Sequence, residues 1–190
     1  MKNLTKISII TLLTLFISNC GENLIEEVKE RYDDGKLKVV EYYKKVGDNQ
    51  KLVRKREYYE NGQIKGEENY KNGNRYLINF WNKDGELLVK DGNGKWTSYY
   101  ENGEIKEEQN YKDGKKDGKW IWYHLNGQII GEGNHKDGER VGKWIFYYEN
   151  GKIWEEGNYK DGKEDGKWIE YYKNGQIEKE TNYKNGELVK

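Results

Sequence analysis

Aromatic and apolar residues occur along the second half of the chain in short runs separated by glycine-containing turns. The pattern returns every 24 residues, and each return is marked by the triplet Gly-Lys-Trp, at Trp96, Trp120, Trp144 and Trp168. A fixed period in this range is the signature of a repeat protein, in which one supersecondary unit stacks on copies of itself. The period therefore favours an extended surface over a single catalytic pocket.

The repeat is regular in four copies and weaker before them. The regular copies are residues 94–117, 118–141, 142–165 and 166–189. Each contains Tyr, Asn-Gly, Ile, Glu and Asn in the same order and ends on Lys-Asp-Gly or Lys-Asn-Gly. Less regular copies begin near residues 32, 58 and 80. We predict a signal peptide over 1–19, a tether over 20–30 and one repeat domain over 31–190.

Each repeat is expected to form two short strands and two tight turns. Asn-Gly between aromatic and polar runs predicts a two-residue type I′ hairpin turn, which needs positive φ at both positions. The closing Asp-Gly or Asn-Gly predicts a second turn of similar kind. Frequent glycine and the lack of a 3.6-residue period argue against a helix after the first twenty residues. The predicted fold is all-β, an elongated single-layer antiparallel meander of tandem hairpins, preceded by a signal helix.

A two-residue turn fixes which residues face each other across each hairpin. In the repeat 94–117 one side of the sheet would carry the pairs Trp96–Gln109, Ser98–Glu107 and Tyr100–Ile105. The other side would carry Lys95–Asn110, Thr97–Glu108 and Tyr99–Lys106. Repetition then predicts one face with Trp and Ile stripes and another with Tyr, Glu and Asn stripes. Glycines at 131, 133 and 157 lie on the tryptophan side and leave room for a neighbouring ring.

The aromatic stripes have two interpretations. Rings in a β repeat mostly pack on one another, but a single-layer sheet cannot bury both of its faces, so part of a stripe is expected to stay open for binding. The candidate binding surface comprises Trp96, Trp120, Trp122, Trp144, Trp168, Tyr99, Tyr123, Tyr147 and Tyr171. The polar stripes are interpreted as a structural ladder of Glu108, Glu132, Glu156, Glu180, Asn110, Asn134, Asn158 and Asn182.

The N-terminal segment indicates export. Two lysines precede an uncharged apolar run over 7–17, which is typical of a secretory signal and short for a membrane span. Ile17-Ser18-Asn19-Cys20 resembles the bacterial lipobox, and this resemblance implies cleavage before Cys20 and lipid attachment to it. We therefore expect a membrane-anchored lipoprotein, with Gly21 suiting the outer membrane. The alternative is an ordinary signal that is cut nearby.

Composition changes this picture little. A mean hydropathy of −1.22 is typical of disordered chains, but 14% aromatic residues supply large rings that bury area efficiently. The net charge of +0 offers no field for nucleic acid.

Nothing in the sequence predicts catalysis. His124 and His135 occupy positions that are Tyr in other repeats, and Ser98 lies in no nucleophile motif. The stretches 113–117 and 161–165 lack the ligand spacing of a calcium loop. We predict no enzyme activity, metal or cofactor.

The unit Gly-Lys-Trp-x-x-Tyr-Tyr-x-Asn-Gly-x-Ile-x-x-Glu-x-Asn-Tyr-Lys-Asp-Gly resembles the bacterial variant of the MORN (membrane occupation and recognition nexus) repeat over roughly residues 30–190. The resemblance implies a β meander used for binding proteins or membrane lipids, and no catalytic residues. We expect a lipid-anchored envelope protein that presents its sheet to a protein, glycan or host surface. The alternative is an antitoxin or immunity-like protein that masks a cognate toxin, because some bacterial relatives carry that label.

Overall fold

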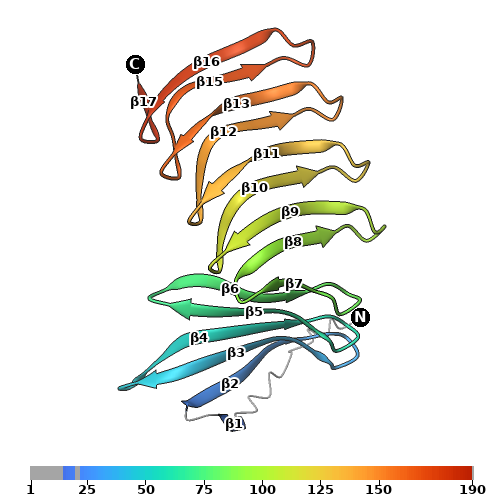
Figure 1. Ribbon diagram of the computed structural model, residues 1–190, viewed down its shortest axis with the longest axis vertical. Helices are drawn as coiled ribbons and strands as arrows, with labels where there is room; N and C mark the ends of the chain where they lie inside the picture. Colours follow the sequence, from blue (N-terminus) through green and yellow to red (C-terminus); the bar gives the residue numbers. More distant parts are fainter. Residues whose placement is uncertain (1–14, 20–21, 190) are drawn as a thin grey trace, which may run out of the picture. The chain divides into compact units, whose positions relative to one another are not determined.

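The computed structural model describes residues 15–19 and 22–189, and the side chains of residues 24–189. Within these residues every regular element is a β-strand, and the strands pair antiparallel with their neighbours (Figure 1). The predicted all-β meander of hairpins is therefore confirmed. No helix in the described part of the chain is long and apolar enough to cross a membrane.

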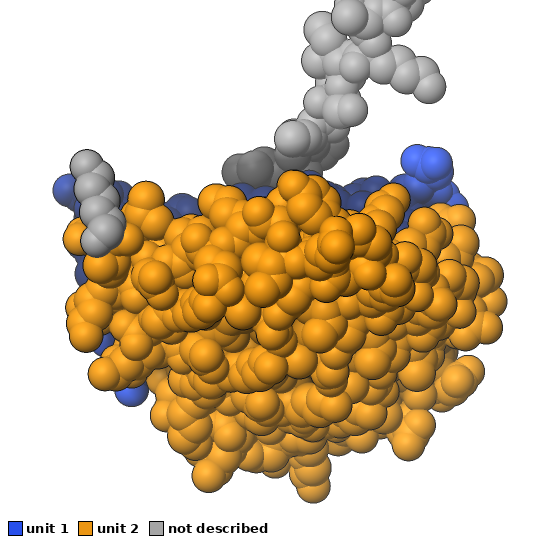
Figure 2. All heavy atoms as spheres, turned by 90° about the horizontal axis from the view of Figure 1, so that it is seen from above, with its two compact units in different colours: residues 1–74 blue, residues 75–190 orange. Residues whose placement is uncertain are grey.

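The chain divides into two compact units, residues 1–74 and 75–190, which Figure 2 shows in different colours. A repeat array holds only nearest-neighbour contacts, so such a division can fall between repeats without marking an independent domain. The single repeat domain over 31–190 stays a prediction. Each unit is described by itself below.

The strands of the first unit pair in chain order. They are β1 (Leu15–Asn19), β2 (Glu22–Arg31), β3 (Leu37–Val46), β4 (Asn49–Tyr58) and β5 (Ile64–Lys71). Val40 and Tyr42 on β3 are its most buried apolar side chains. Residues 1–14 of the predicted signal segment and Cys20 lie outside the described residues. Residues 15–19 of that segment form β1, which pairs with β2.

The second unit contains the regular repeats. Its strands are β6 (Asn74–Trp81), β7 (Leu87–Lys90), β8 (Asn93–Tyr99), β9 (Ile105–Lys112), β10 (Lys115–Tyr123), β11 (Ile129–Lys136), β12 (Glu139–Tyr147), β13 (Ile153–Lys160), β14 (Lys163–Glu164), β15 (Gly166–Tyr171), β16 (Ile177–Lys184) and β17 (Glu187–Val189). A small core of Leu77, Phe80 and Val89 lies at its start.

The closing turn of each repeat has the predicted geometry. Asp113 and Gly114 both have positive φ, 49° and 78°, and Lys112 pairs with Lys115 across a two-residue turn. This is the type I′ geometry. The same positive-φ pair occurs at 72–73, 91–92, 137–138, 161–162 and 185–186.

The Asn-Gly turns differ from the prediction. Only Gly103 has positive φ, 89°, and its amide donates to the Tyr100 carbonyl at 3.0 Å. The Tyr100 amide donates to the Glu104 carbonyl at 2.8 Å, which leaves three residues in the loop rather than two. Asn102 accepts a bond from the Glu104 amide through its side chain at 3.1 Å. Asparagine is therefore used here as a side-chain acceptor and not for positive φ.

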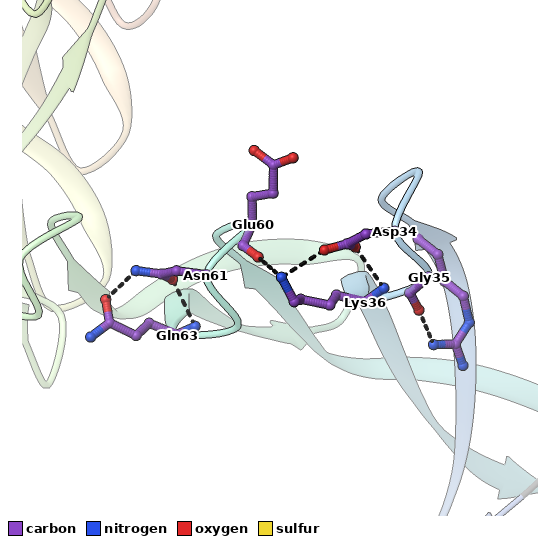
Figure 3. Close-up of polar contacts among 7 residues, drawn as sticks. Asp34, Gly35, Lys36, Glu60, Asn61 and Gln63 are labelled. Atoms are coloured by element: carbon purple, nitrogen blue, oxygen red, sulfur yellow. Dashed lines mark hydrogen bonds and ion pairs between the residues drawn. The ribbon is translucent and has the colours of Figure 1, made fainter.

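Figure 3 shows the same use of a side-chain acceptor in the first unit. Asn61 Oδ1 accepts from the Gln63 amide at 3.0 Å, and Asp34 Oδ1 accepts from the Lys36 amide at 3.0 Å. The Lys36 ammonium also donates to the Glu60 carbonyl at 3.1 Å, which links one turn to the next. The weak early copies therefore share the turn chemistry of the regular repeats.

The longer turn shifts part of the predicted register. Trp96, Thr97 and Ser98 face Gln109, Glu108 and Glu107 as predicted, but Tyr99 faces Ile105, and Lys106 is the extra residue of a bulge. The bulge offsets the additional loop residue, so the register away from the turn is the predicted one. Direct partners share a face, so the Ile stripe lies with the Tyr stripe and not with Trp, which corrects the prediction. The equivalent pairs are Tyr123–Ile129, Tyr147–Ile153 and Tyr171–Ile177.

Candidate binding surface

The face that carries Trp96, Trp120, Trp144 and Trp168, here called the tryptophan face, is largely closed by its own rings. Trp120, Trp144 and Trp168 are 8%, 0% and 3% exposed. The Trp120 and Trp144 ring centroids lie 5.1 Å apart, and the Tyr159 ring packs edge-on between Trp144 and Trp168 at 5.7 Å and 5.2 Å. These three tryptophans form the core of the repeats, so they offer no surface to a partner.

Glycine makes this closure possible. Gly133 faces Trp120 across the hairpin, and an added Cβ there would lie 2.2 Å from the Trp144 ring. Gly157 has the same relation to Trp168, at 2.1 Å. Each ring therefore lies directly on the backbone of the preceding repeat, as the positions of these glycines predicted.

Basic groups complete the cover over Trp144. The Arg140 guanidinium lies 4.5 Å from the Trp144 ring centroid, and the His135 ring packs against the same indole edge-on at 5.1 Å. Burial lowers the pKa of His135 to about 4, with further contributions from Lys116 and Arg140. His135 is therefore a neutral packing residue at physiological pH.

The opposite face, here called the tyrosine face, carries a repeated Lys–Glu–Tyr contact. Glu132 lies 3.0 Å from the Lys119 ammonium and accepts a hydrogen bond from the Tyr147 hydroxyl at 2.9 Å. The bond from Lys119 lowers the pKa of Glu132, and burial together with the bond to Glu132 raises that of Tyr147 to about 12. The equivalent contacts are Lys95–Glu108–Tyr123 and Lys143–Glu156–Tyr171, and Glu180 pairs with Lys167.

These contacts engage most of the tyrosine stripe in links between repeats. Tyr123, Tyr147 and Tyr171 are half-buried, whereas Tyr99 is 48% exposed. The asparagine stripe is engaged less uniformly: Asn110 donates through its side chain to the Lys119 carbonyl at 2.9 Å. The glutamates thus act as the structural ladder that the sequence predicted, one rung per repeat.

A second tyrosine clamps two of the Asn-Gly turns of the regular repeats to the next repeat. The Tyr100 hydroxyl donates to the Tyr123 carbonyl, and that of Tyr148 to the Tyr171 carbonyl, both at 2.6 Å. His124 occupies the equivalent position between them, and its buried Nε2 has no hydrogen-bond partner. The histidine replaces the tyrosine of this clamp, and it lines a surface pocket together with Glu149. Ser98 faces Glu107 within a strand.

One part of the tryptophan face stays open. Trp122 is 38% and Trp154 42% exposed, and the half-buried Phe146 lies near both, with its ring centroid 6.2 Å from that of Trp154. Phe146 and Trp122 both face Gly131, whose added Cβ would lie 2.7 Å from the Phe146 ring. We call Trp122, Phe146 and Trp154 the open row.

The open row is a departure from the repeat. The position of Trp122 and Phe146 holds Ser98 in the preceding repeat and Glu170 in the last one. The position of Trp154 holds Lys106, Ile130 and Glu178 elsewhere. Trp122 belongs to the predicted binding surface, whereas Phe146 and Trp154 do not, because they are not part of the residues that the repeats share. The signal that identifies them is an aromatic residue at a position where most of the other repeats have no aromatic residue.

Within the described residues no cluster of three or more His, Cys, Asp or Glu side chains could hold a metal ion. The glutamate ladder is engaged by lysine and tyrosine, and the histidines are packing residues. What the arrangement can do is present an apolar patch from two adjacent repeats to another molecule.

Comparison with known proteins agrees with the repeat architecture. The model of the MORN repeat variant family matches residues 27–45, 54–72, 92–113, 116–137, 140–161 and 164–185, which is more than half of the chain. A search of curated proteins finds no match. A solved structure of a protein of unknown function from Bacteroides fragilis is similar at 12% identity, over 87% of this chain and 96% of that chain, but its TM-score of 0.19 carries no argument. On the family match, the chain belongs to the MORN repeat variant family.

Proposed function

We propose that the chain is a non-enzymatic envelope protein, held on a membrane through lipid on Cys20, that binds a partner through the open row. The observation that carries the binding proposal is that neighbouring side chains cover Trp120, Trp144 and Trp168, whereas Trp122 and Trp154 stay exposed, with the half-buried Phe146 beside Trp154. Exposed apolar patches of this kind mark interaction sites on soluble surfaces.

The scaffold supports a binding role. Each repeat is tied to the next by ring packing, the tyrosine clamp and turn-to-turn bonds such as Gly138 amide to Lys116 carbonyl at 2.8 Å. A surface on two such repeats is held in place before a partner arrives, which reduces the ordering cost of binding. Family membership is consistent with a binding scaffold.

The anchor rests on the sequence. Ile17-Ser18-Asn19-Cys20 resembles the lipobox, and Cys20 is the single cysteine of the chain. Two or more acyl chains on one residue give stable membrane attachment, whereas one chain gives marginal binding. Attachment at Cys20 would place the lipid just before β2, because most of the predicted tether over 20–30 is a strand that pairs with β3.

The experiment places a photo-reactive phenylalanine analogue at position 122 of the full chain in bacterial cells, with position 98 as the matched control in the preceding repeat. We expect a discrete cross-linked product from position 122, in the membrane fraction, and little from position 98. Cys20→Ala should move the chain out of the membrane fraction. Equal cross-linking from both positions would refute the surface, and membrane retention of Cys20→Ala in the same processed form would refute the anchor.

A further inference from the structure

The open row lies between carboxylates on both sides. Across the strands of the tryptophan face, Trp122 is flanked by Glu107, and Phe146 is flanked by Glu155. Glu155 in turn faces Glu170. The residues that face one another across successive strands are therefore an acid, an aromatic residue, a glycine, an aromatic residue and two acids. No other row of facing residues in the described repeats has this order.

The three carboxylates differ in how they are engaged. Glu107 accepts a bond from the Trp120 indole at 2.6 Å, and Glu170 pairs with the Lys179 ammonium at 3.0 Å. For Glu155 the structure shows neither a hydrogen bond nor an ion pair, although its side chain is half-buried beside Phe146. Burial raises the pKa of Glu155, the nearby Glu170 and Glu164 raise it further, and Lys179 lowers it. A cation placed beside this carboxylate would relieve both effects.

The chain places cations over several of its other rings. Besides Arg140 over Trp144, a lysine ammonium lies 5.7 Å from the Tyr100 ring centroid and another 5.9 Å from that of Tyr148. Over Trp122, Phe146 and Trp154 the described residues place no such group. Along the same face, Lys179 is engaged by Glu170, and Arg140 is engaged by Trp144 and the Tyr159 hydroxyl.

We propose that the open row binds an arginine or lysine side chain of a polypeptide partner, with the cation over the neighbouring rings of Phe146 and Trp154 and hydrogen-bonded to Glu155. Tryptophan is the strongest ring for a cation, and a carboxylate adds a charge-assisted bond to the same group. The flanking acids disfavour anionic partners such as nucleic acid or acidic lipid. This inference rests on the proposed function and specifies the chemistry of its partner.

The test uses a hexa-arginine peptide and a hexa-glutamate peptide as probes, titrated into the full chain with tryptophan fluorescence and calorimetry. We expect binding of hexa-arginine and none of hexa-glutamate. Glu155→Gln should weaken binding roughly tenfold, and the double variant Trp122→Ala/Trp154→Ala should weaken it further. Glu101→Gln, an exposed acid in an Asn-Gly turn, is the matched control and should leave the affinity within about twofold.

Equal losses in Glu155→Gln and Glu101→Gln would mean that the peptide follows overall charge, and the inference would be wrong. Binding of neither peptide would also overturn it. If position 122 still cross-links a partner in cells in either case, the proposed function survives and only the cationic chemistry fails. Circular dichroism of each variant separates a lost site from a lost fold.

Discussion

Replacing Gly133 with alanine is expected to destabilise the repeat unit by about 3 kcal/mol or more. The added Cβ would lie 2.2 Å from the Trp144 ring, and Trp144 is fully buried among the rings of Trp120, Phe146 and Tyr159. In an open strand the same change would stabilise by roughly 0.5 kcal/mol, because glycine loses more backbone freedom on folding. The sign of the change in unfolding free energy, measured by urea denaturation, therefore shows whether the Trp144 ring lies on the backbone at Gly133.

Two controls separate ring contact from a general strand effect. Thr181→Ala changes the equivalent position in the last repeat, which faces Trp168 and already accepts a Cβ, so its cost should stay below about 1 kcal/mol. In a Trp144→Leu background the cost of Gly133→Ala should also fall below about 1 kcal/mol. A stabilised Gly133→Ala protein, or an unchanged cost in the Trp144→Leu background, would contradict the packing described here.

Acidification from pH 6.5 to pH 4 is expected to remove up to about 3 kcal/mol of stability through His135 alone. Burial holds the pKa of His135 near 4 in the folded chain, below the ordinary histidine value of 6.5. Between these two pH values the unfolded chain binds the proton and the folded chain does not. The free energy of unfolding therefore decreases as pH falls. The contribution is complete above pH 6.5 and declines through this window.

The matched variant is His135→Tyr, because tyrosine occupies this position in the other regular repeats, as at Tyr111 and Tyr159. Denaturation at pH 7 and pH 4.5 should show a smaller loss for the variant than for the natural chain. The difference in stability loss between the two chains gives the contribution of His135 alone. Carboxylates such as Glu155, whose raised pKa stabilises the folded chain as pH falls, contribute equally to both chains. Parallel loss in both chains would show that His135 is not buried in its neutral form.

The sequence predicted the parts of the fold that depend on period and turn chemistry. Positive φ at Asp113-Gly114 follows from residues that tolerate it, and the ring over Gly133 follows from a glycine opposite a repeated tryptophan. The Asn-Gly turn could not be predicted so simply, because Asn102 has two uses, a positive φ or a side-chain acceptor. The turn uses the acceptor, and the bulge at Lys106 then moves isoleucine to the other face.

The candidate site was predicted in part. Trp122 and Trp144 are the same residue type on the same face, and they differ in whether neighbouring rings cover them, which depends on the side chains of adjacent strands. Trp144 is enclosed by Arg140 and the rings of Trp120, His135 and Tyr159, whereas among the described residues only the Trp120 ring lies beside Trp122. Comparison of each repeat position for departures from the consensus would have identified Phe146 and Trp154. Lipid attachment at Cys20 stays a prediction.

Trp120, Trp144 and Trp168 form the core of the repeats, and we propose the open row as the binding surface. Oxidative footprinting with mass spectrometry, on the purified chain and on the chain in its native envelope, tests both parts at once. We predict that Trp122 and Trp154 react in the purified chain and lose reactivity in the envelope, while Trp144 and Trp168 stay unreactive in both. Reactivity of Trp144 equal to that of Trp122, or unchanged reactivity of Trp122 and Trp154 in the envelope, would contradict the account.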